Sequence, residues 1–214
     1  LLLYAKEAFN AKTAAMIYES SDFGMGAFKI VSDLVADYGI EIIINEVYNS
    51  GESDFSVQLT KIKEANPDVI ILWGYYTEAA LICRQIKQYN IDIPIIGTGY
   101  NSPALIELGG DAVNGLIFTT AFTAANPAPV VQEFDKKYTE LFQSGYDQNA
   151  PQSYDAVYVI ADAVTRCMND GKDWSNGEIL RDYIASTEYN GVTGLTKFDA
   201  SGEMIKTLLV VRIE

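Results

Sequence analysis

The chain has 214 residues, of which 49% are apolar and 21% charged, so it can bury a sizeable core and is not intrinsically disordered. It carries 29 acidic and 15 scattered basic residues, for a net charge of -14, which argues against nucleic acid or an anionic lipid surface as a partner. Histidine is absent, and this removes histidine-based triads, the imidazole general base and most zinc or iron sites.

Apolar runs alternate with amphipathic helical patterns through the first half of the chain. After an opening helix, residues 13–18 are predicted to form a strand, and residues 19–22 supply cap residues for a helix that Gly39 ends. The second strand is predicted at residues 40–48. Ser53 is predicted to cap the next helix, which buries Phe55, Leu59 and Ile62.

The third strand, predicted at residues 69–73, leads into Gly74-Tyr75-Tyr76-Thr77, where Thr77 is expected to cap a helix. Asn90 is expected to end that helix, and strands follow at residues 95–98 and 116–122 with a short helix at 103–108 between them. This alternation predicts an α/β fold with a parallel, doubly wound sheet. Because all strand-to-helix turns then lie along one edge, residues 20–23, 75–77 and 98–101 are predicted to line one ligand cleft.

The pattern changes at the linker 123–129. Helices are predicted at 130–142, 154–168 and 178–186, and then two strands separated by a turn at 199–202. The helices have apolar faces and no evident sheet, so either they pack on each other or their sheet is missing from this chain. The loop 169–174 does not have the acidic spacing of an EF-hand. Cys83 and Cys167 are expected to be buried small residues rather than a disulfide or a redox pair.

Several residue groups occur in an order that resembles one family, and the resemblance covers essentially the whole chain. The groups are Ile17-Tyr18 with Asp22-Phe23-Gly24-Met25-Gly26, Gly51-Glu52-Ser53-Asp54-Phe55, Asn66-Pro67-Asp68, Gly74-Tyr75-Tyr76-Thr77-Glu78 with Arg84-Gln85, and Tyr154-Asp155-Ala156-Val157 with Gly191-Val192-Thr193-Gly194 and Phe198-Asp199. As a set they resemble the branched-chain amino acid type of periplasmic solute-binding protein, a type I two-lobe receptor that serves ABC transporters.

The resemblance implies two lobes joined by chain crossovers near residues 10–13, 120–123 and 202–206. Residues 12–121 and about 204–214 would form the second, α/β lobe. Residues 1–11 and 122–203 would be the mostly helical remainder of the first lobe, whose first half precedes this chain. Apolar surface exposed by that absence is expected to favour a dimer.

The family binds a small solute between its lobes by hinge closure and passes it to an ABC permease in the membrane. The resemblance therefore implies an amino acid or related carboxylate or amide as ligand, no enzymatic step and no cofactor. It also implies a periplasmic or extracellular location, with a lipid anchor in the full-length form as one option. An extracellular sensor domain of a signalling receptor has the same fold and stays open as the alternative.

Family ligand contacts on the second lobe correspond to Phe23, Tyr75 and Gly99, the last standing where the family has an acidic residue that pairs with the ligand's ammonium. A charged partner is worth roughly 1.5 to 3 kcal/mol, against about 1 kcal/mol for a neutral hydrogen bond. Tyr100 and Asn101 follow Gly99. Either Asp22 or the Tyr100 hydroxyl replaces the acid, or the ligand lacks an ammonium.

Two enzymatic interpretations have less support than the solute-binding one. Gly24-Met25-Gly26 superficially resembles a dinucleotide fingerprint, but position 29 is lysine instead of glycine. Asp22 and Asp54 are conceivable as an acid and base pair, yet nothing in the sequence places them together.

Overall fold

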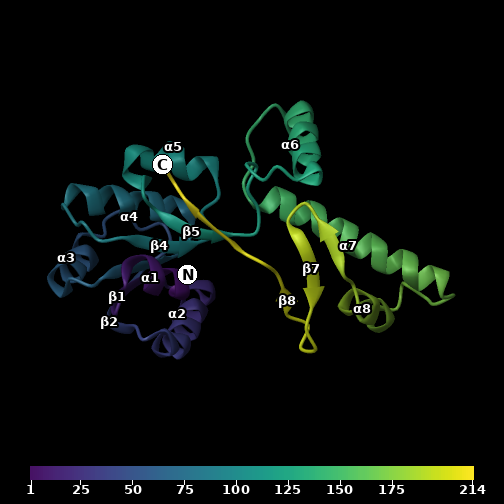
Figure 1. Cartoon of the computed structure of the whole chain (residues 1–214), viewed down its shortest axis with the longest axis horizontal. Helices are drawn as coiled ribbons and strands as arrows, with labels where there is room; N and C mark the ends of the chain where they lie inside the picture. The colour runs from purple at the N-terminus through teal and green to yellow at the C-terminus, as the bar shows by residue number, and fades with distance from the viewer. The chain divides into compact units, whose positions relative to one another are not determined.

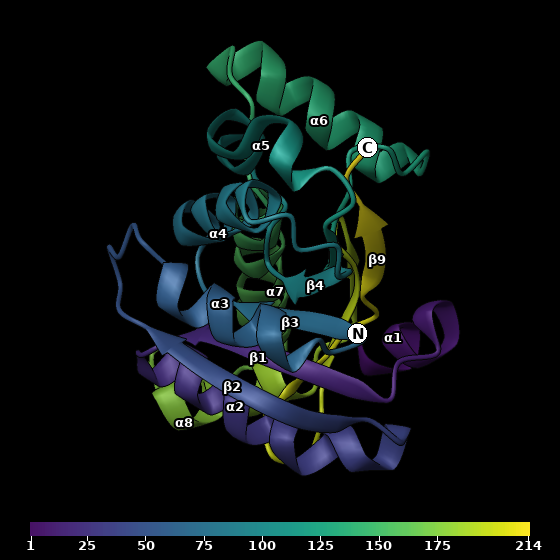
Figure 2. The same cartoon turned by 90° about the vertical axis from the view of Figure 1, so that its left-hand side faces the viewer.

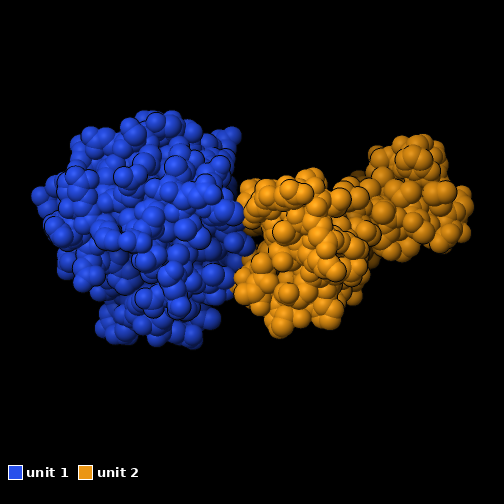
Figure 3. All heavy atoms as spheres, turned by 90° about the horizontal axis from the view of Figure 1, so that it is seen from above, with its two compact units in different colours: residues 1–120, 210–214 blue, residues 121–209 orange.

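The computed structural model describes residues 1–214 as two compact units, coloured separately in Figure 3. Unit 1 comprises Leu1–Thr120 and Val210–Glu214, and unit 2 comprises Ala121–Leu209. Helix α1 (Leu2–Phe9) belongs to unit 1, because Leu2 and Ala5 are buried in one of its hydrophobic clusters. The contacts thus group residues 1–11 differently from the predicted lobes, whose boundaries stay a prediction.

Unit 1 is built on a six-stranded sheet (Figure 1). Its strands lie in the order β2-β1-β3-β4-β5-β9, and the pairs β1–β2, β1–β3, β3–β4 and β4–β5 are parallel. The strand bounds are β1 Thr13–Glu19, β2 Glu41–Tyr48, β3 Val69–Trp73, β4 Ile95–Thr98, β5 Ile117–Thr120 and β9 Leu209–Arg212. The predicted parallel α/β sheet is confirmed.

Alternate residues of the central strands face opposite sides of the sheet, as the two-residue period of a strand requires. Ala15 and Ile17 of β1 point into one hydrophobic cluster, and Met16 and Tyr18 point into the other. The first cluster is covered by α3 (Ser56–Ala65), α4 (Tyr76–Gln88), α5 (Pro103–Gly109) and the 3-10 helix η2 (Gly110–Val113). The second is covered by α1, α2 (Asp22–Leu34) and η1 (Val35–Tyr38), so helices lie on both faces (Figure 2).

In unit 1, two helices end where the sequence predicts, and two helices start at other residues than predicted. Gly39 and Asn90 both have positive φ, 72° and 52°, as predicted for left-handed residues at helix ends. The Ser53 cap was wrong: α3 starts after Phe55, whose side chain is fully buried and whose N–H donates to Gln85 Oε1 at 2.8 Å. The Thr77 cap was wrong too, because the extended backbone of Tyr75 already starts α4.

Asp68, beside the breaker Asn66-Pro67, ties the start of β3 to the start of β1. Its Oδ2 accepts hydrogen bonds from the N–H groups of Lys12 and Thr13, both at 2.8 Å, and from Thr13 Oγ1 at 2.9 Å. The backbone bonds from Lys12 and Thr13 lower the pKa of Asp68 below its ordinary 3.8. A depressed folded-state pKa stabilises above the unfolded value, and that stabilisation is lost as the pH falls through the folded value.

We therefore expect Asp68→Asn to be less stable than the parent at neutral pH and to lose less stability on acidification. Urea unfolding midpoints at about pH 6 and about pH 2.5 measure both effects, because the first lies above and the second below the unfolded-state pKa of about 3.9. Asp33→Asn, an exposed acid on α2, is the matched control. Equal acid sensitivity in Asp68→Asn and the parent would contradict this account.

Unit 2 contains α6 (Pro129–Phe142), α7 (Asn149–Asn169) and α8 (Gly177–Ala185). It also contains a small antiparallel sheet that the sequence did not predict, formed by β6 (Tyr189–Gly191), β7 (Gly194–Phe198) and β8 (Met204–Ile205). The sequence predicted one strand where the chain makes the β6–β7 hairpin, which Gly194 allows with φ 80°.

Unit 2 has a buried aromatic cluster and leaves several apolar side chains of α7 exposed. Phe122, Val131, Phe134 and Val192 are buried together, with the Phe134 and Tyr154 ring centroids 5.1 Å apart. On α7, by contrast, Val157, Tyr158, Ile160 and Met168 are exposed.

The two cysteines of the chain are free and buried, as predicted. None of the helices combines the length and apolar character needed to cross a bilayer.

Candidate ligand-binding site

The strand order creates a switch point at the carboxyl edge of the unit 1 sheet. From β1 the chain passes to β2 on one side and later to β3 on the other side of β1. Helices that leave β1 and β3 therefore diverge to opposite faces, and ligands of open α/β sheets bind at such points. Phe23 lies in the first turn of α2 after β1, and Tyr75 is the N-cap of α4 after β3.

Three aromatic side chains meet at this switch point and are called here the aromatic group: Phe23, Trp73 and Tyr75. The Phe23 ring centroid lies 5.6 Å from that of Tyr75 and 6.0 Å from that of Trp73. Phe23 and Tyr75 are 45% and 52% exposed. The structure thus brings two predicted ligand residues together and leaves their ring surface accessible to an apolar solute.

The remaining predicted residues lie on the same edge, except one. Asp22 is exposed beside Phe23 at the start of α2. Gly99, with φ 78°, and the partly buried Asn101 follow β4, the strand next to β3. The N–H of Gly99 donates to the carbonyl of Thr119 at 3.2 Å.

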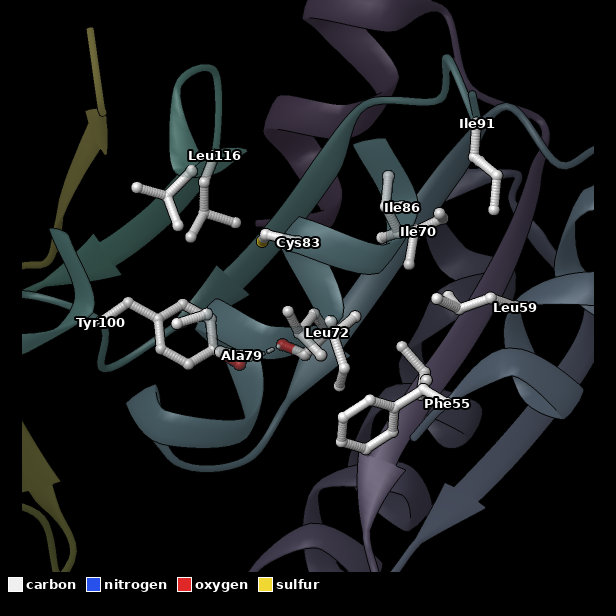
Figure 4. Close-up of a cluster of buried hydrophobic side chains, with 14 of the residues drawn as sticks. Phe55, Leu59, Ile70, Leu72, Ala79, Cys83, Ile86, Ile91, Tyr100 and Leu116 are labelled. Atoms are coloured by element: carbon white, nitrogen blue, oxygen red, sulfur yellow. Dashed lines mark hydrogen bonds between the residues drawn. The ribbon is translucent and has the colours of Figure 1, made fainter. Parts of the chain in front are cut away.

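Tyr100 is a core residue and cannot replace the missing acid. Its side chain is 1% exposed, its ring lies in the cluster shown in Figure 4, and its hydroxyl donates to the carbonyl of Leu72 at 3.0 Å. Burial raises the pKa of this hydroxyl well above 10.0. The ring also needs Gly97, where a Cβ would come within 2.4 Å of it. The sequence signal was ambiguous because a tyrosine after a strand suits a cleft or a core equally.

A buried polar network that the sequence did not predict supports the aromatic group. Glu19, at the end of β1, accepts from the N–H of Ser21 at 3.0 Å and from the Ser21 hydroxyl. Glu78 accepts from the N–H of Gly51 at 2.8 Å. Between these two buried acids the Tyr48 hydroxyl donates to the carbonyl of Trp73 at 3.3 Å. Burial, Glu78 and Glu19 together raise the pKa of Tyr48.

This network fixes the turns that carry Phe23 and Tyr75. A Cβ on Gly74 would lie 1.8 Å from the Tyr48 hydroxyl, so only glycine allows the turn into α4 to pack this closely. Polar residues that end apolar strands, Glu19 in β1 and Tyr48 in β2, are the sequence signal that could have revealed the network, since buried acids require partners.

One buried polar atom in the aromatic group has no hydrogen-bond partner. The indole Nε1 of Trp73 is buried and makes no hydrogen bond. A buried donor without an acceptor costs roughly 1 to 3 kcal/mol, so such groups are few in folded proteins. Trp73 was predicted as part of a strand and was not identified as a site residue.

The residues behind the two enzymatic interpretations have local structural roles. A Cβ on Gly24 would lie 1.8 Å from the carbonyl oxygen of Glu19, so this glycine lets α2 pack against β1 and needs no phosphate to explain it. Asp54 accepts from the N–H of Ser56 at 3.0 Å, and that bond lowers the pKa of Asp54. No group of three or more His, Cys, Asp or Glu side chains is placed to hold a metal ion.

A cavity of about 460 Å³ lies elsewhere in unit 1, around the starts of β4 and β5. Its lining includes Tyr4, Lys87, Asp92, Asp111 and Arg212. The strand starts are at the opposite ends of the strands from the aromatic group. The carboxyl edge is therefore the candidate ligand site, because the switch point, the exposed rings and the buried network coincide there.

Comparisons with known proteins agree with this geometry. A family model described as "Periplasmic binding protein" matches residues 1–214. The leucine-, isoleucine-, valine-, threonine- and alanine-binding protein of Pseudomonas aeruginosa is 26% identical over 209 residues, which are 94% of this chain and 52% of that protein. The chain therefore spans about half the length of the curated relatives it matches.

Solved structures show the same fold. The leucine-binding protein LivK of Thermotoga maritima has a TM-score of 0.88 and 31% identity, over 100% of this chain and 60% of that chain. The branched-chain amino acid transporter substrate-binding protein LivJ of Streptococcus pneumoniae, solved with isoleucine, has a TM-score of 0.82 and 28% identity, over 98% and 59% of the two chains.

Proposed function

The chain belongs to the periplasmic binding protein family, and from this premise we propose that it is part of the solute-binding component of an ABC-type importer. The observation that carries the proposal is the pair of exposed rings, Phe23 and Tyr75, at the switch point of a parallel sheet. The protein would capture a solute outside the cytoplasmic membrane and deliver it to a membrane permease. Binding and release need no bond-breaking step.

We propose a small solute with an apolar body as the ligand, such as a branched-chain amino acid. Relatives named for leucine, isoleucine and valine binding support this class. Two aromatic rings suit an aliphatic side chain, because they offer apolar area at little entropic cost. With Gly99 lacking a side chain and Tyr100 held in the core, Asp22 is the remaining predicted residue that can pair with an ammonium group.

The test is a thermal-shift and calorimetry panel on the 214-residue chain with leucine, isoleucine, valine, glutamate and glucose. A ligand at about 100 times its Kd adds about 2.7 kcal/mol to the free energy of unfolding, which is readily seen as a higher Tm. We expect the aliphatic amino acids to raise the Tm and glutamate and glucose to leave it unchanged. A panel without any shift would contradict binding of an aliphatic amino acid by this chain.

Replacing Phe23 or Tyr75 by alanine should weaken binding of the compound that gives the largest shift by at least about tenfold, because central aromatic contacts are worth about 1.4 kcal/mol or more. Calorimetric Kd values measure the loss. Ile30→Ala is the matched control, since Ile30 lies on α2 and is 61% exposed. Unchanged affinity in both aromatic variants would move the ligand away from this edge.

A further inference from the structure

Trp73 stands apart from the other members of the aromatic group, because its ring carries a buried hydrogen-bond donor that has no partner in the folded chain. Its backbone carbonyl is taken by the Tyr48 hydroxyl, whereas its indole Nε1 is buried without an acceptor. Buried donors are normally paired, and each exception calls for a reason.

The position of Trp73 gives a reason for its unpaired donor. It is the last residue of β3, directly before the turn at Gly74, and so it lies at the switch point of the sheet. The ring that packs beside it is Phe23, which is itself 45% exposed on the first turn of α2. Exposed side chains change rotamer on the picosecond to nanosecond timescale, so the Phe23 ring can move away from the indole within the lifetime of an encounter.

The charges around the indole restrict what it can bind. The ionisable side chains of the adjoining turns are acidic: Asp22 beside Phe23, Glu19 at the end of β1, and Glu78 in the first turn of α4. No lysine or arginine belongs to residues 13–28 or 64–83. An indole N–H binds an oxygen acceptor, and a solute that carries only negative charge would meet uncompensated repulsion here.

We propose that Trp73 is a specificity-determining residue that donates its indole N–H to an oxygen of the bound solute, once the Phe23 ring turns aside. The class of solute it selects is zwitterionic or neutral, such as an amino acid or an amide, over a simple carboxylate anion. This inference rests on the proposed function, and it adds the atom that recognises the ligand and the charge of the ligand.

The experiment uses three probes that share one aliphatic body: L-leucine, 4-methylpentanamide and 4-methylpentanoate. Calorimetric Kd values are measured for the parent chain, Trp73→Phe and the control Trp174→Phe, which alters an exposed tryptophan of unit 2. We expect the amino acid or the amide to bind the parent more tightly than the anion does. Trp73→Phe, which keeps a ring and loses the N–H, should weaken that binding about tenfold, and Trp174→Phe should leave it unchanged.

A second measurement leaves Trp73 intact. The chain has two tryptophans, so ¹⁵N-labelled Trp174→Phe shows one indole N–H signal, that of Trp73. Saturation with the tightest probe should move its proton downfield and slow its exchange with water. Equal affinity in the parent and Trp73→Phe with an unmoved indole signal, while a probe still binds, would overturn the inference and leave the proposed function standing. Failure of every probe to bind would overturn both.

Discussion

Gly24→Ala is expected to destabilise unit 1 by about 3 kcal/mol, the upper end of the usual cost of overpacking, because the added Cβ meets rigid backbone. A Cβ at this position would lie 1.8 Å from the carbonyl oxygen of Glu19 and 2.8 Å from its carbonyl carbon. Neither atom can swing away as a flexible side chain would, since both belong to β1. Helix α2 must therefore move off the sheet and carry Phe23 with it.

Urea unfolding followed by Trp73 fluorescence in the Trp174→Phe background measures the loss within unit 1. Gly26→Ala is the matched control, because it lies on the same helix and a Cβ there meets nothing within 4 Å. This control should be neutral or should gain up to about 1 kcal/mol from helix propensity. Comparable stability of the two alanine variants would refute the close contact between α2 and β1. Ligand affinity should fall in Gly24→Ala and persist in Gly26→Ala.

The contrast between the two glycines shows what local sequence can and cannot reveal. A Gly-x-Gly at a strand-to-helix turn is compatible with phosphate binding, close packing or a flexible turn, and only the neighbouring strand decides among them. Here the first glycine packs on β1 and the second faces open space. The turn was predictable, but its chemical purpose was a long-range property.

The parallel sheet itself was predictable because its central strands are buried on both faces and consist of apolar runs. Residues 69–73 are a clear case: four of the five are buried, and they pair with β1 on one side and β4 on the other. The β6–β7 hairpin was not predictable in the same way. It is three and five residues long, and its turn is held by a side chain 37 residues earlier in the sequence.

The candidate site likewise contains residues whose position could be predicted from the sequence and residues whose position could not. Phe23 and Tyr75 could be predicted because they follow strands directly, and their position at the edge needs no tertiary information. Tyr100 also follows a strand, yet its ring turns into the core, because Gly97 and the Leu72 carbonyl provide space and an acceptor there. The direction in which a side chain leaves a turn depends on partners remote in sequence, so neither the burial of Tyr100 nor the contact of Trp73 with Phe23 could be predicted.

Asp155→Ala is expected to destabilise unit 2 by about 3 kcal/mol or more, because each buried donor left without an acceptor costs about 1 to 3 kcal/mol. Asp155 is 3% exposed, and its carboxylate accepts from the N–H groups of Val192 and Thr193 at 2.8 and 2.7 Å and from the Thr193 hydroxyl. Alanine would leave three donors of the β6–β7 turn buried and unpaired.

Hydrogen exchange at the Val192 and Thr193 amides measures this directly, since both should lose protection in Asp155→Ala beyond that explained by global unfolding. Asp162→Ala, on the same helix α7, is the control: its ion pair with Arg166 is 46% exposed at the aspartate and is worth about 0.3 to 0.5 kcal/mol. If both variants lost the same small amount, the hairpin would be held by its strands alone. A large loss confined to Asp155→Ala would instead show that one carboxylate on α7 fixes the small sheet to the helices of unit 2.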